Sequence, residues 1–457
     1  MSTRFEPSGA LGGSLRPPGD KSISHRVALI AAMGDGETTI EGYLDAADTR
    51  STLSAVRSLG AEVEIGSAGA GDSGGFRQDR GGSGMPVKGL LRIRGVGLRG
   101  ARSAAIDPGN AGTLLIDVGN AGTLLRLLPG WLAGQPQGVW TLDGDDSIRR
   151  RPIDRIREPL AAMGAQVSCR ENRFTPVTIE AAPLHGIEYE LPVASAQVKS
   201  CLLLAGLLAE GETRIVEPQP SRDHSERMLA AAGADIRRDG DAVVVQPAER
   251  LAIEWIVVPG DFSSAAFFVA AALLVPGSDV VLTGVGLNPT RTGLLPILAR
   301  MGAEIEVEPE GERGAEPSGR LRIRPSQLRG TEIGGDEIPL AIDELPLVAL
   351  AACFAEGETT IRDAAELRRK ESDRIATVSE ALTALGATVE TSEDGMRIEG
   401  TGGLRGGAID SHGDHRIAML GAIAGLASRE GVEVAGMEAA AVSYPGFEAD
   451  LASLMDL

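Results

Sequence analysis

The stretch GETTIEG at residues 36–42 decides the fold, because it recurs along the whole chain. The copies are GETRIVE (211–217), PGSDVVLTG (276–284) and GETTIRD (357–363), with weaker versions in GVWTLDG (138–144) and GVEVAG (431–436). Each copy has a glycine turn and the alternating pattern of a short strand, and it follows an apolar run typical of a buried helix. The chain therefore contains six related units.

A second phrase follows the first at a distance within each unit. Its copies are SLGAEVEI (58–65), AMGAQVSC (162–169), AAGADIRR (231–238), RMGAEIEV (300–307) and ALGATVET (384–391). Each reads as a helix that ends on a left-handed glycine cap and continues into a strand. The sixth copy would begin near residues 447–457, where the chain ends after one helix.

Units of this strand–helix–strand–helix–strand kind predict an α/β protein. At about 60–80 residues each, they are longer than the units of most solenoids. Three units in each of two domains is the economical arrangement, with its midpoint between the third and fourth units, near Val258–Gly260. The alternative is one long α/β solenoid.

The composition excludes several functions. Of the 457 residues, 44 are Lys or Arg and 64 are Asp or Glu, and only 3% are aromatic, so a nucleic-acid partner is not expected. The longest apolar run, Ala265–Val275, is too short to cross a bilayer, and the N-terminus lacks a signal sequence. Three well-separated cysteines predict neither disulfides nor a zinc site. We expect a cytoplasmic monomer without a membrane or metal partner.

Polar residues gather where each of the six apolar helices begins. The segments are GDKSISHR (19–26), GNAGTLLR (119–126), ASAQVKS (194–200), GDFSS (260–264), IDELP (342–346) and SHGDHR (411–416). Ordinary N-caps explain the Ser, Asn and Asp residues, but the helix dipole disfavours cations in a first turn. Bound anions explain those cations, which are Lys21, Arg26, Arg126, Lys199, His415 and Arg416. The sequence therefore predicts an anion-binding cleft between two domains.

Two further segments add positive charge. SIRRRP (147–152) precedes a helix that begins near its proline, and LRRKESDR (367–374) places Lys370 and Arg374 one helical turn apart. Taken alone, each segment is also compatible with a solvated charge run. The chain has neither a Walker A loop nor a GxGxxG fingerprint, so no nucleotide cofactor is predicted.

Together these strings resemble the 5-enolpyruvylshikimate-3-phosphate synthase family, and most closely its class II bacterial members. The resemblance runs from PGDKSISHR (18–26) to YPGF (444–447) and includes SAQVKS, SRDH (221–224), NPTRTG (288–293), RRKESDR and GDHRIAM (413–419). It implies the enolpyruvyl transferase fold, a two-domain inverse α/β barrel with three βαβαββ-type repeats in each domain. Residues 1–19 and 260–457 would form the first domain, and residues 20–259 the second.

The resemblance also implies the reaction, in which phosphoenolpyruvate and the 5-hydroxyl of shikimate 3-phosphate give an enolpyruvyl ether and phosphate, without metal or redox cofactor. The implied residues fall into three groups. The catalytic groups are Asp343 as the proton acceptor, with Glu371 and Lys21 as proton shuttles. The shikimate 3-phosphate ligands are Lys21, Ser22, Arg26, Ser195, Ala196, Gln197, Arg222, Asp343 and Lys370. The phosphoenolpyruvate ligands are Lys21, Asn120, Gly122, Arg151, Gln197, Arg374 and Arg416. Because residue 122 is glycine, we expect glyphosate to fit. The rival activity is enolpyruvyl transfer to UDP-N-acetylglucosamine.

The sequence contains two insertions, of which the second departs from the family pattern. Residues 66–84 hold eight glycines and predict a flexible surface insertion between two strands. IDPGNAGTLL (106–115) is repeated at once as IDVGNAGTLL (116–125), and only the second copy continues into an unbroken apolar helix with Arg126. We therefore assign the second copy to the pocket and expect the first to loop out. The alternative is an inactive anion-binding homologue that this duplication has disabled.

Overall fold

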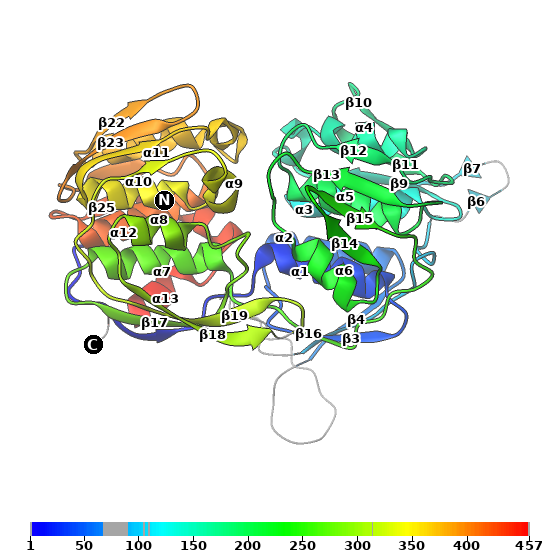
Figure 1. Ribbon diagram of the computed structural model, residues 1–457, viewed down its shortest axis with the longest axis horizontal. Coiled ribbons are helices and arrows are strands. Elements are labelled where there is room, and N and C mark those ends of the chain that lie inside the picture. The colour runs from blue at the N-terminus through cyan, green and yellow to red at the C-terminus, as the bar shows by residue number, and fades with distance from the viewer. Residues whose placement is uncertain (1, 67–89, 104–105, 108–109, 313, 456–457) are drawn as a thin grey trace, which may run out of the picture.

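The structure is a computed structural model that describes residues 2–66, 90–103, 106–107, 110–312 and 314–455. Two lobes lie side by side, and both chain termini belong to the same lobe (Figure 1). Each lobe has its own hydrophobic core: one runs from Ile23 to Val258, and the other joins Leu11 to Phe262–Leu454. The domain boundaries near residues 19 and 259 stay a prediction, which this division of the core supports.

Six sheets share one strand order, in which the first strand is parallel to the second and the remaining pairs are antiparallel. In the lobe built around residues 20–259, the sheets are β16 (Trp255–Val257), β3 (Glu37–Glu41), β5 (Leu91–Arg94), β4 (Glu62–Ile65); β8 (Leu114–Asp117), β9 (Val139–Asp143), β11 (Phe174–Glu180), β10 (Gln166–Arg170); and β12 (Glu188–Glu190), β13 (Thr213–Val216), β15 (Ala242–Val245), β14 (Ile236–Asp239). The predicted repeat thus corresponds to one sheet per unit.

The other lobe repeats this order. Its sheets are β2 (Gly12–Leu15), β17 (Asp279–Gly286), β19 (Pro317–Ile323), β18 (Ile305–Glu312); β20 (Glu332–Ile333), β21 (Glu356–Ile361), β23 (Met396–Thr401), β22 (Thr388–Thr391); and β24 (Gly407–Asp410), β25 (Val432–Ala435), β1 (Ser2–Phe5). Among the described residues, the sixth sheet has three strands. The N-terminal strand β1 is one of them and pairs antiparallel with β25.

Six apolar helices fill the centres of the lobes: α1 (Lys21–Met33), α3 (Gly122–Ala133), α5 (Ala196–Gly206), α7 (Phe262–Leu274), α10 (Leu345–Phe354) and α12 (His415–Ala427). They are apolar nearly all round because they are covered on every side; every residue of α7 is buried. Less apolar helices lie between them and solvent: α2 (Ala47–Ser58), α4 (Asp154–Ala162), α6 (His224–Ala231), α8 (Leu294–Arg300), α11 (Arg374–Ala384) and α13 (Phe447–Ser453). Short elements complete the chain: α9 (Glu337–Ala341) and the 3₁₀ turns η1 (Ile148–Arg150), η2 (Ala365–Arg369) and η3 (Met437–Val442).

The chain crosses between the lobes twice, and the two crossing segments pair with each other. The Asp20 N–H donates to Pro259 O at 2.8 Å, and the Asp261 N–H donates to Pro18 O at 2.7 Å. A Cβ at Gly19 would lie 1.9 Å from Gly42 O, so only glycine fits where the first crossing meets β3. The paired crossings form a narrow connection, at the base of the two lobes in Figure 1.

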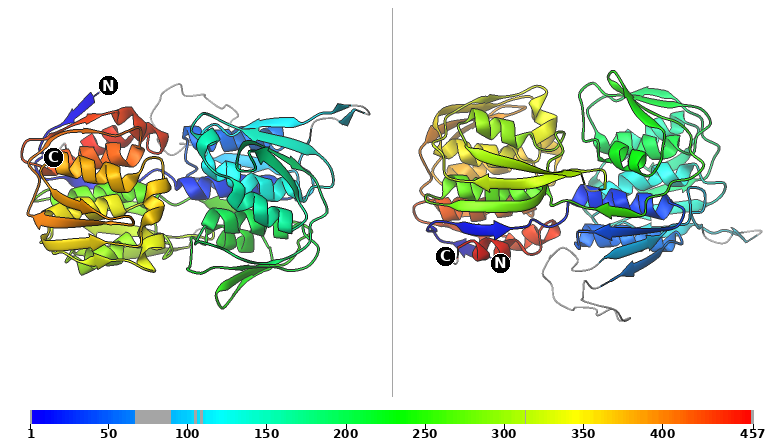
Figure 2. Two further views of the ribbon diagram at one scale, coloured as in Figure 1. Left: turned by 90° about the horizontal axis from the view of Figure 1, so that it is seen from above. Right: turned by 60° about the horizontal axis from the view of Figure 1, so that its bottom comes forward.

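The duplicated segment forms a short hairpin of β6 (Ile106–Asp107) and β7 (Asn110–Ala111), which lies at the outer edge of its lobe, away from the other lobe (Figures 1 and 2). The looped-out part is shorter than predicted, because Leu114 and Leu115 of the first copy belong to β8 and pair with β9. The second copy leads into α3. The glycine-rich insertion lies almost wholly outside the described residues; Gly66, at its start, donates to Leu90 O at 2.9 Å between β4 and β5.

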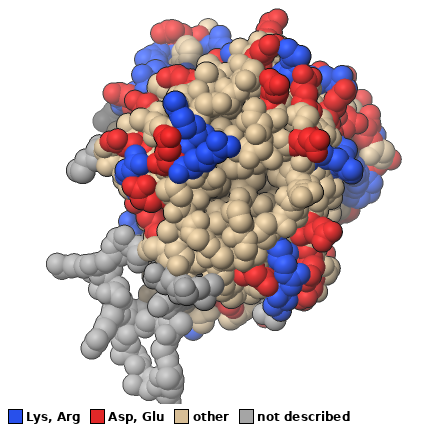
Figure 3. Space-filling model, turned by 90° about the vertical axis from the view of Figure 1, so that its left-hand side faces the viewer, with Lys and Arg blue, Asp and Glu red and all other residues tan. Residues whose placement is uncertain are grey.

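On the face that the lobe with both termini turns away from the other lobe, acidic and basic side chains are interspersed around a largely uncharged area (Figure 3). None of the helices that the structure describes is long and apolar enough to cross a membrane.

Candidate active site

Asp343 lies at the start of the apolar helix α10, where the sequence changes from polar to apolar. Its carboxylate is surrounded by cations from several elements. Lys370 Nζ and Arg374 Nη1 lie 3.4 Å from Oδ1, Arg222 Nη2 donates a short hydrogen bond to Oδ2, and Oδ2 is 3.8 Å from Arg291 Nη1 and 3.9 Å from Arg416 Nη2. The side chain is only 13% exposed.

The charges around Asp343 set its ionisation. Burial by itself raises the pKa of a carboxyl group, but Lys370, Arg222, Arg416 and Arg291 outweigh burial and hold the pKa of Asp343 well below its ordinary value. Asp343 is therefore a carboxylate at neutral pH and can accept a proton. It is a weak base until negatively charged ligands offset the surrounding cations.

Arg374 is held rigidly at the N-terminus of α11. Its guanidinium is 1% exposed and donates to Asp414 at 2.9 Å and to Glu371 at 2.6 Å. Burial lowers the pKa of an arginine, yet Glu371 and Asp414 raise that of Arg374 above its ordinary value. The sequence predicted that Lys370 and Arg374 lie one turn apart on one helix, and this prediction is wrong. Lys370 directly follows η2, and Arg374 is the first residue of α11. The two cations therefore reach the same Oδ1 of Asp343 from either side of a break between helices.

The start of α12 contributes Arg416, whose Nη1 donates to the backbone oxygen of Asp343 at 3.0 Å. Its neighbour His415, which the sequence counted among the cations, is buried. Burial, Lys21 and Arg416 lower the pKa of His415 to about 3, so it is neutral at physiological pH. Glu371 also differs from a free carboxyl: burial raises its pKa, but Arg374, with Arg151 and Lys370, brings it below its ordinary range.

In the other lobe, α1 brings Lys21, Ser22 and Arg26 to the cleft. Lys21 Nζ lies 3.3 Å from Asp48 Oδ2. Arg26 is buried, and its three nitrogens donate to hydroxyl and carbonyl oxygens: Ser225 Oγ at 2.9 Å, Ser22 O at 3.0 Å and Ser200 Oγ at 3.1 Å. Burial lowers the pKa of Arg26 to about 10. A buried guanidinium held by neutral groups keeps most of its charge for an anion.

The start of α5 supplies Ser195, Ala196 and Gln197. Ser195 is the N-cap and accepts a hydrogen bond from the Val198 N–H at 3.4 Å, and the other N–H groups of the first turn have no partner within the helix. Gln197 Nε2 donates to Thr123 Oγ1 at 3.3 Å and thereby joins α5 to α3. Lys199, counted from the sequence among the anion-binding cations, is instead fully buried between Glu217 (3.0 Å) and Glu226 (2.6 Å).

The second copy of the duplicated motif places Asn120 just before α3 and Gly122 as its first residue. A Cβ at Gly122 would lie 3.0 Å from Arg126 Nη1 and 3.1 Å from Arg151 Nη1, so glycine leaves room for both guanidinium groups. Burial, together with repulsion from Arg151 and Arg155, lowers the pKa of Arg126 to about 10. Among the arginines of SIRRRP, Arg149 forms an ion pair with Asp143 on the surface. Arg151 instead helps to lower the pKa of Glu371, which belongs to the other lobe.

Contacts that join the two lobes include Arg222 to Asp343, Arg155 to Glu366 at 3.4 Å, and Gln219 to Asp336 at 3.0 Å. SRDH and NPTRTG stand out as motifs in the sequence, but the sequence alone predicted no role for Arg291, Asp261 or Glu344. These three residues lie beneath the cleft. The signal that could have revealed Arg291 is its position in NPTRTG, because a charged residue between two buried elements needs a partner.

Within the described ranges, no three His, Cys, Asp or Glu side chains are grouped to hold a metal ion. The three cysteines also lie outside the cleft groups. Cys201 and Cys353 are buried in α5 and α10, and burial raises the pKa of each thiol to about 12, while Cys169 lies in β10. Acid–base chemistry by carboxylates and cations is what this arrangement can perform.

The chain has six α/β units in two domains, and cations from both domains meet around buried carboxylates beside the connection. These features define a transferase of the enolpyruvyl transferase fold. The model of the EPSP synthase (3-phosphoshikimate 1-carboxyvinyltransferase) family matches residues 5–71 and 91–451, which leaves out most of the glycine-rich insertion. The chain belongs to this family.

Individual relatives agree over nearly the full length. The chain is 47% identical to the 3-phosphoshikimate 1-carboxyvinyltransferase of Desulfitobacterium hafniense (strain DSM 10664 / DCB-2) over 97% of this chain and 95% of that protein. It is 47% identical to that of Alkalilimnicola ehrlichii over 98% and 94%. The solved EPSP synthase of Acinetobacter baumannii superposes with a TM-score of 0.85 at 41% identity, covering 99% of this chain and 98% of that one.

Proposed function

We propose that this chain transfers the enolpyruvyl group of phosphoenolpyruvate to the 5-hydroxyl of shikimate 3-phosphate and releases phosphate, a step of aromatic amino-acid biosynthesis. The observation that carries the proposal is Asp343, a buried carboxylate in contact with cations of both domains. A carboxylate so placed can take a proton from a hydroxyl group while the same cations bind the negatively charged groups of two substrates.

The two domains divide the binding of the substrates. Arg26, Ser195, Ala196 and Gln197 lie at helix starts of one domain and suit a phosphate monoester and its ring, with Ser22, Arg222 and Lys370 nearby. Phosphoenolpyruvate would lie between Asn120, Gly122 and Arg151 of the same domain and Arg374 and Arg416 of the other. Because Arg374 and Arg416 come from the domain that contains residues 260–457, the phosphoenolpyruvate site is complete only when the domains are together.

The reaction is an addition followed by an elimination. In the first step Asp343 accepts the proton of the 5-hydroxyl group of shikimate 3-phosphate. The hydroxyl oxygen then bonds to C2 of phosphoenolpyruvate, and C3 of phosphoenolpyruvate gains a proton. In the second step C3 loses a proton, the bond between C2 and the phosphate oxygen breaks, and phosphate leaves with the bonding pair. The cations near the phosphate stabilise the negative charge that develops on the leaving oxygen.

Lys21 and Glu371 are the groups that would deliver and recover the proton at C3. Glu371 is ionised because Arg374, with Arg151 and Lys370, outweighs its burial, so it is suited to recover a proton. Bound phosphate and carboxylate groups lower the net positive charge near Glu371 and raise its pKa towards a value useful for an acid. Lys21, with three N–H donors next to Asp48, can deliver a proton while touching both substrates.

The rival activities are less well supported. Transfer to UDP-N-acetylglucosamine would use a reactive cysteine near the substrate, but the described cysteines lie in α5, α10 and β10, away from the cleft groups. An inactive scaffold would require the duplication to disturb the pocket. The hairpin of β6 and β7 lies at the outer edge of its domain, and the second copy leads into α3 (Figure 1).

The test is phosphate release by the purified chain with phosphoenolpyruvate and either shikimate 3-phosphate or UDP-N-acetylglucosamine. With phosphoenolpyruvate present, we expect turnover with shikimate 3-phosphate and none with UDP-N-acetylglucosamine. Turnover only with the nucleotide sugar would identify the rival activity, and binding of shikimate 3-phosphate without turnover would identify the scaffold.

We also propose that the enzyme is a monomer in the cytoplasm, since the active site draws its residues from both domains of one chain. Sedimentation at micromolar concentration tests the oligomeric state.

A further inference from the structure

Arg291 lies at the centre of a cluster of four carboxylates. It belongs to the loop between β17 and α8, and its side chain is 5% exposed. Its Nη1 lies 3.2 Å from Glu344 Oε1 and 3.8 Å from Asp343 Oδ2, its Nη2 lies 3.3 Å from Asp261 Oδ1, and its Nε lies 4.0 Å from Asp20 Oδ2. One guanidinium therefore links four acidic groups that come from three distant parts of the chain.

Two of these carboxylates belong to the connection between the domains. Asp20 is the N-cap of α1 and Asp261 is the N-cap of α7, and each directly follows one of the paired crossings. Asp261 also accepts a hydrogen bond from the backbone N–H of Lys21 at 3.3 Å. The position of Lys21 is thus tied to Asp261, and through Asp261 to Arg291.

The other two carboxylates lead into the catalytic helix α10. Glu344 is its N-cap residue and is fully buried, where it accepts hydrogen bonds from Arg291 and from the Ser263 hydroxyl. Asp343 precedes it. A planar guanidinium with donors in a fixed fork can hold carboxylates on two sides at once, which a lysine ammonium on a flexible stem does less well. Arg291 therefore fixes the start of α10 relative to the crossings.

Electrostatics makes Arg291 necessary for this arrangement. Burial and the neighbouring Asp261 raise the pKa of Asp20 above its ordinary value, and His224 and Arg291 offset only part of that rise. Burial also raises the pKa of Asp261, but Arg291 and Arg416 outweigh burial and bring it below its ordinary value. Without Arg291, buried like charges would repel one another across the connection.

The same loop holds the segment that carries Arg222. Asn288 Nδ2 donates to Asp223 Oδ1 at 2.6 Å and to Glu316 Oε2 at 3.0 Å, and the Thr290 hydroxyl donates to Asp223 Oδ1 at 3.2 Å. Asp223 follows Arg222 directly, so the loop of one domain orients a predicted substrate ligand of the other.

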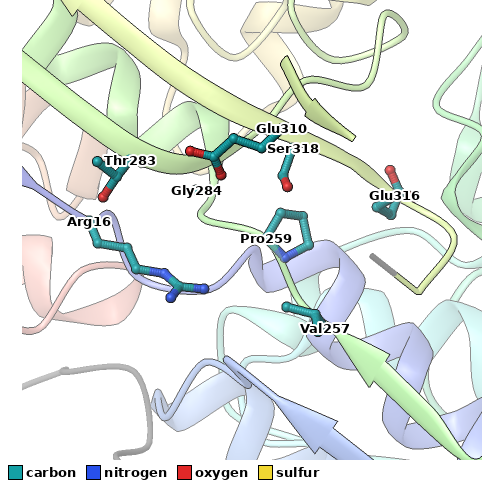
Figure 4. A pocket seen from close by; sticks show the side chains of 8 residues that line it. All are labelled: Arg16, Val257, Pro259, Thr283, Gly284, Glu310, Glu316 and Ser318. Carbon is teal, nitrogen blue, oxygen red and sulfur yellow. The ribbon is translucent and has the colours of Figure 1, made fainter. Parts of the chain in front are cut away.

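Both crossings are buried, and a cavity borders the second one at Val257 and Pro259, with Arg16 and the Glu310 side chain on its other walls (Figure 4). The ion pairs of Arg291 with Asp20 and Asp261 add to the packing of the crossings.

We propose that Arg291 is a positioning residue of the transfer reaction, which ties the two interdomain crossings to the start of α10 so that Lys21 and Asp343 face the same cleft. The inference rests on the proposed function, because it concerns the groups of that reaction. Arg291 acts through Asp261, Asp20 and Glu344, beneath the substrate-binding groups.

The test compares Arg291→Gln, Arg291→Lys and the double variant Arg291→Gln/Asp261→Asn with the unaltered enzyme. We expect kcat of Arg291→Gln to fall about 100-fold, since a misplacement of about 1 Å costs that much, with an intermediate loss for Arg291→Lys. The dissociation constant of shikimate 3-phosphate, measured by calorimetry, should stay near that of the unaltered enzyme because its predicted ligands lie mainly in the other domain. The double variant removes one cation and one anion, so it should fold even if Arg291→Gln does not, and its kcat should remain low.

The pH profile supplies a readout that a loss of stability would not move. The charged groups that face Asp343 are Lys370, Arg222, Arg416, Arg291, Arg374 and the neighbouring Glu344. Loss of the Arg291 charge raises the pKa of Asp343, so the acid limb of kcat/KM should move to higher pH in Arg291→Gln.

Arg322→Gln is the matched control, because Arg322 forms a surface ion pair with Asp279 at 2.6 Å in the same domain; its kcat should not change. A folded double variant with kcat and acid limb equal to those of the unaltered enzyme would overturn the proposal. If the unaltered chain binds shikimate 3-phosphate but does not turn over, the proposed function fails. The positioning role is then decided by calorimetric binding of phosphoenolpyruvate in the presence of shikimate 3-phosphate, which Arg291→Gln should weaken and Arg322→Gln should not.

Discussion

Arg222, in the loop before α6 of one domain, donates a hydrogen bond to Oδ2 of Asp343, which lies before α10 of the other domain and 121 residues further along the chain. The contact joins a predicted substrate ligand to the predicted base. When a negatively charged substrate binds Arg222, the carboxylate of Asp343 loses one partner and becomes a stronger base. Substrate binding and activation of the base are thus linked through one guanidinium.

Asp343→Asn tests the base. Asparagine keeps the size of the side chain but cannot accept the hydroxyl proton, so we expect kcat to fall by about 10³-fold, within the range of general-base contributions. Binding of shikimate 3-phosphate should persist, because its predicted phosphate ligands are unchanged. Phosphate release and calorimetry provide the two measurements. Asp45→Asn, which removes a surface carboxylate paired with Arg50 at 2.5 Å, is the control; equal losses in both variants would contradict the assignment.

Gly122→Ala tests the phosphoenolpyruvate site. The added methyl group would lie 3.0 Å from Arg126 Nη1 and 3.1 Å from Arg151 Nη1, so both guanidinium groups have to shift. We expect KM for phosphoenolpyruvate to rise, kcat to change less, and inhibition by glyphosate to weaken. Gly9→Ala is the control, since its Cβ meets nothing within 4 Å. Unchanged KM and inhibition in Gly122→Ala would remove Gly122 from the site.

Deletion of residues 106–115 tests which copy of the duplicated motif serves the pocket. The deletion removes the β6–β7 hairpin and Leu115, whose side chain is 71% exposed, and it leaves Ala104 and Ala105 directly before Ile116. We expect turnover to be preserved or raised, because the deletion takes only Leu114 and Leu115 from β8 and the β6–β7 hairpin is a surface loop that adds little to the free energy of folding. Kinetics and thermal unfolding of both forms are the measurements. A folded deletion variant without activity would show that the first copy is the functional one.

His25→Gln tests the pH dependence of stability. His25 is 1% exposed, its Nδ1 lies 2.6 Å from Thr52 Oγ1, and burial together with Lys21 and Arg26 lowers its pKa to about 3. Because the unfolded chain takes up the proton near pH 6.5 and the folded chain does not, stability is full above pH 6.5 and falls as the pH drops towards 3. Between pH 7.5 and pH 5, the free energy of unfolding should fall by about 2 kcal/mol because His25 stays neutral in the folded chain.

Urea unfolding at both pH values measures that loss. His25→Gln should lose about 2 kcal/mol less than the unaltered chain over this interval. His412→Gln, at a histidine whose side chain is 40% exposed, should behave like the unaltered chain. Equal pH dependence in His25→Gln and the unaltered chain would show that His25 is not held neutral.

Most of the candidate site could be predicted because its residues lie at helix starts. Lys21, Ser195, Gly122 and Arg416 are each within two residues of the N-terminus of an apolar helix, and the change from polar to apolar sequence marks that position. The same rule misassigned Lys199 and His415. Both follow an N-cap, but Lys199 lies between Glu217 and Glu226, and His415 is buried and neutral. A helix start therefore predicts the place of a side chain along the chain but not the direction in which it points.

By itself, the sequence determined the six units, their strand and helix order, and the family, since turns, caps and apolar periodicity are local properties written into neighbouring residues. Only the tertiary structure decided that β1 completes the sixth sheet, that Leu114 and Leu115 join β8, and that Arg222 and Arg291 meet Asp343. These contacts join residues far apart in the chain, and they form because two separately packed domains share a short paired connection. The position of one domain against the other is set by contacts that no local pattern encodes.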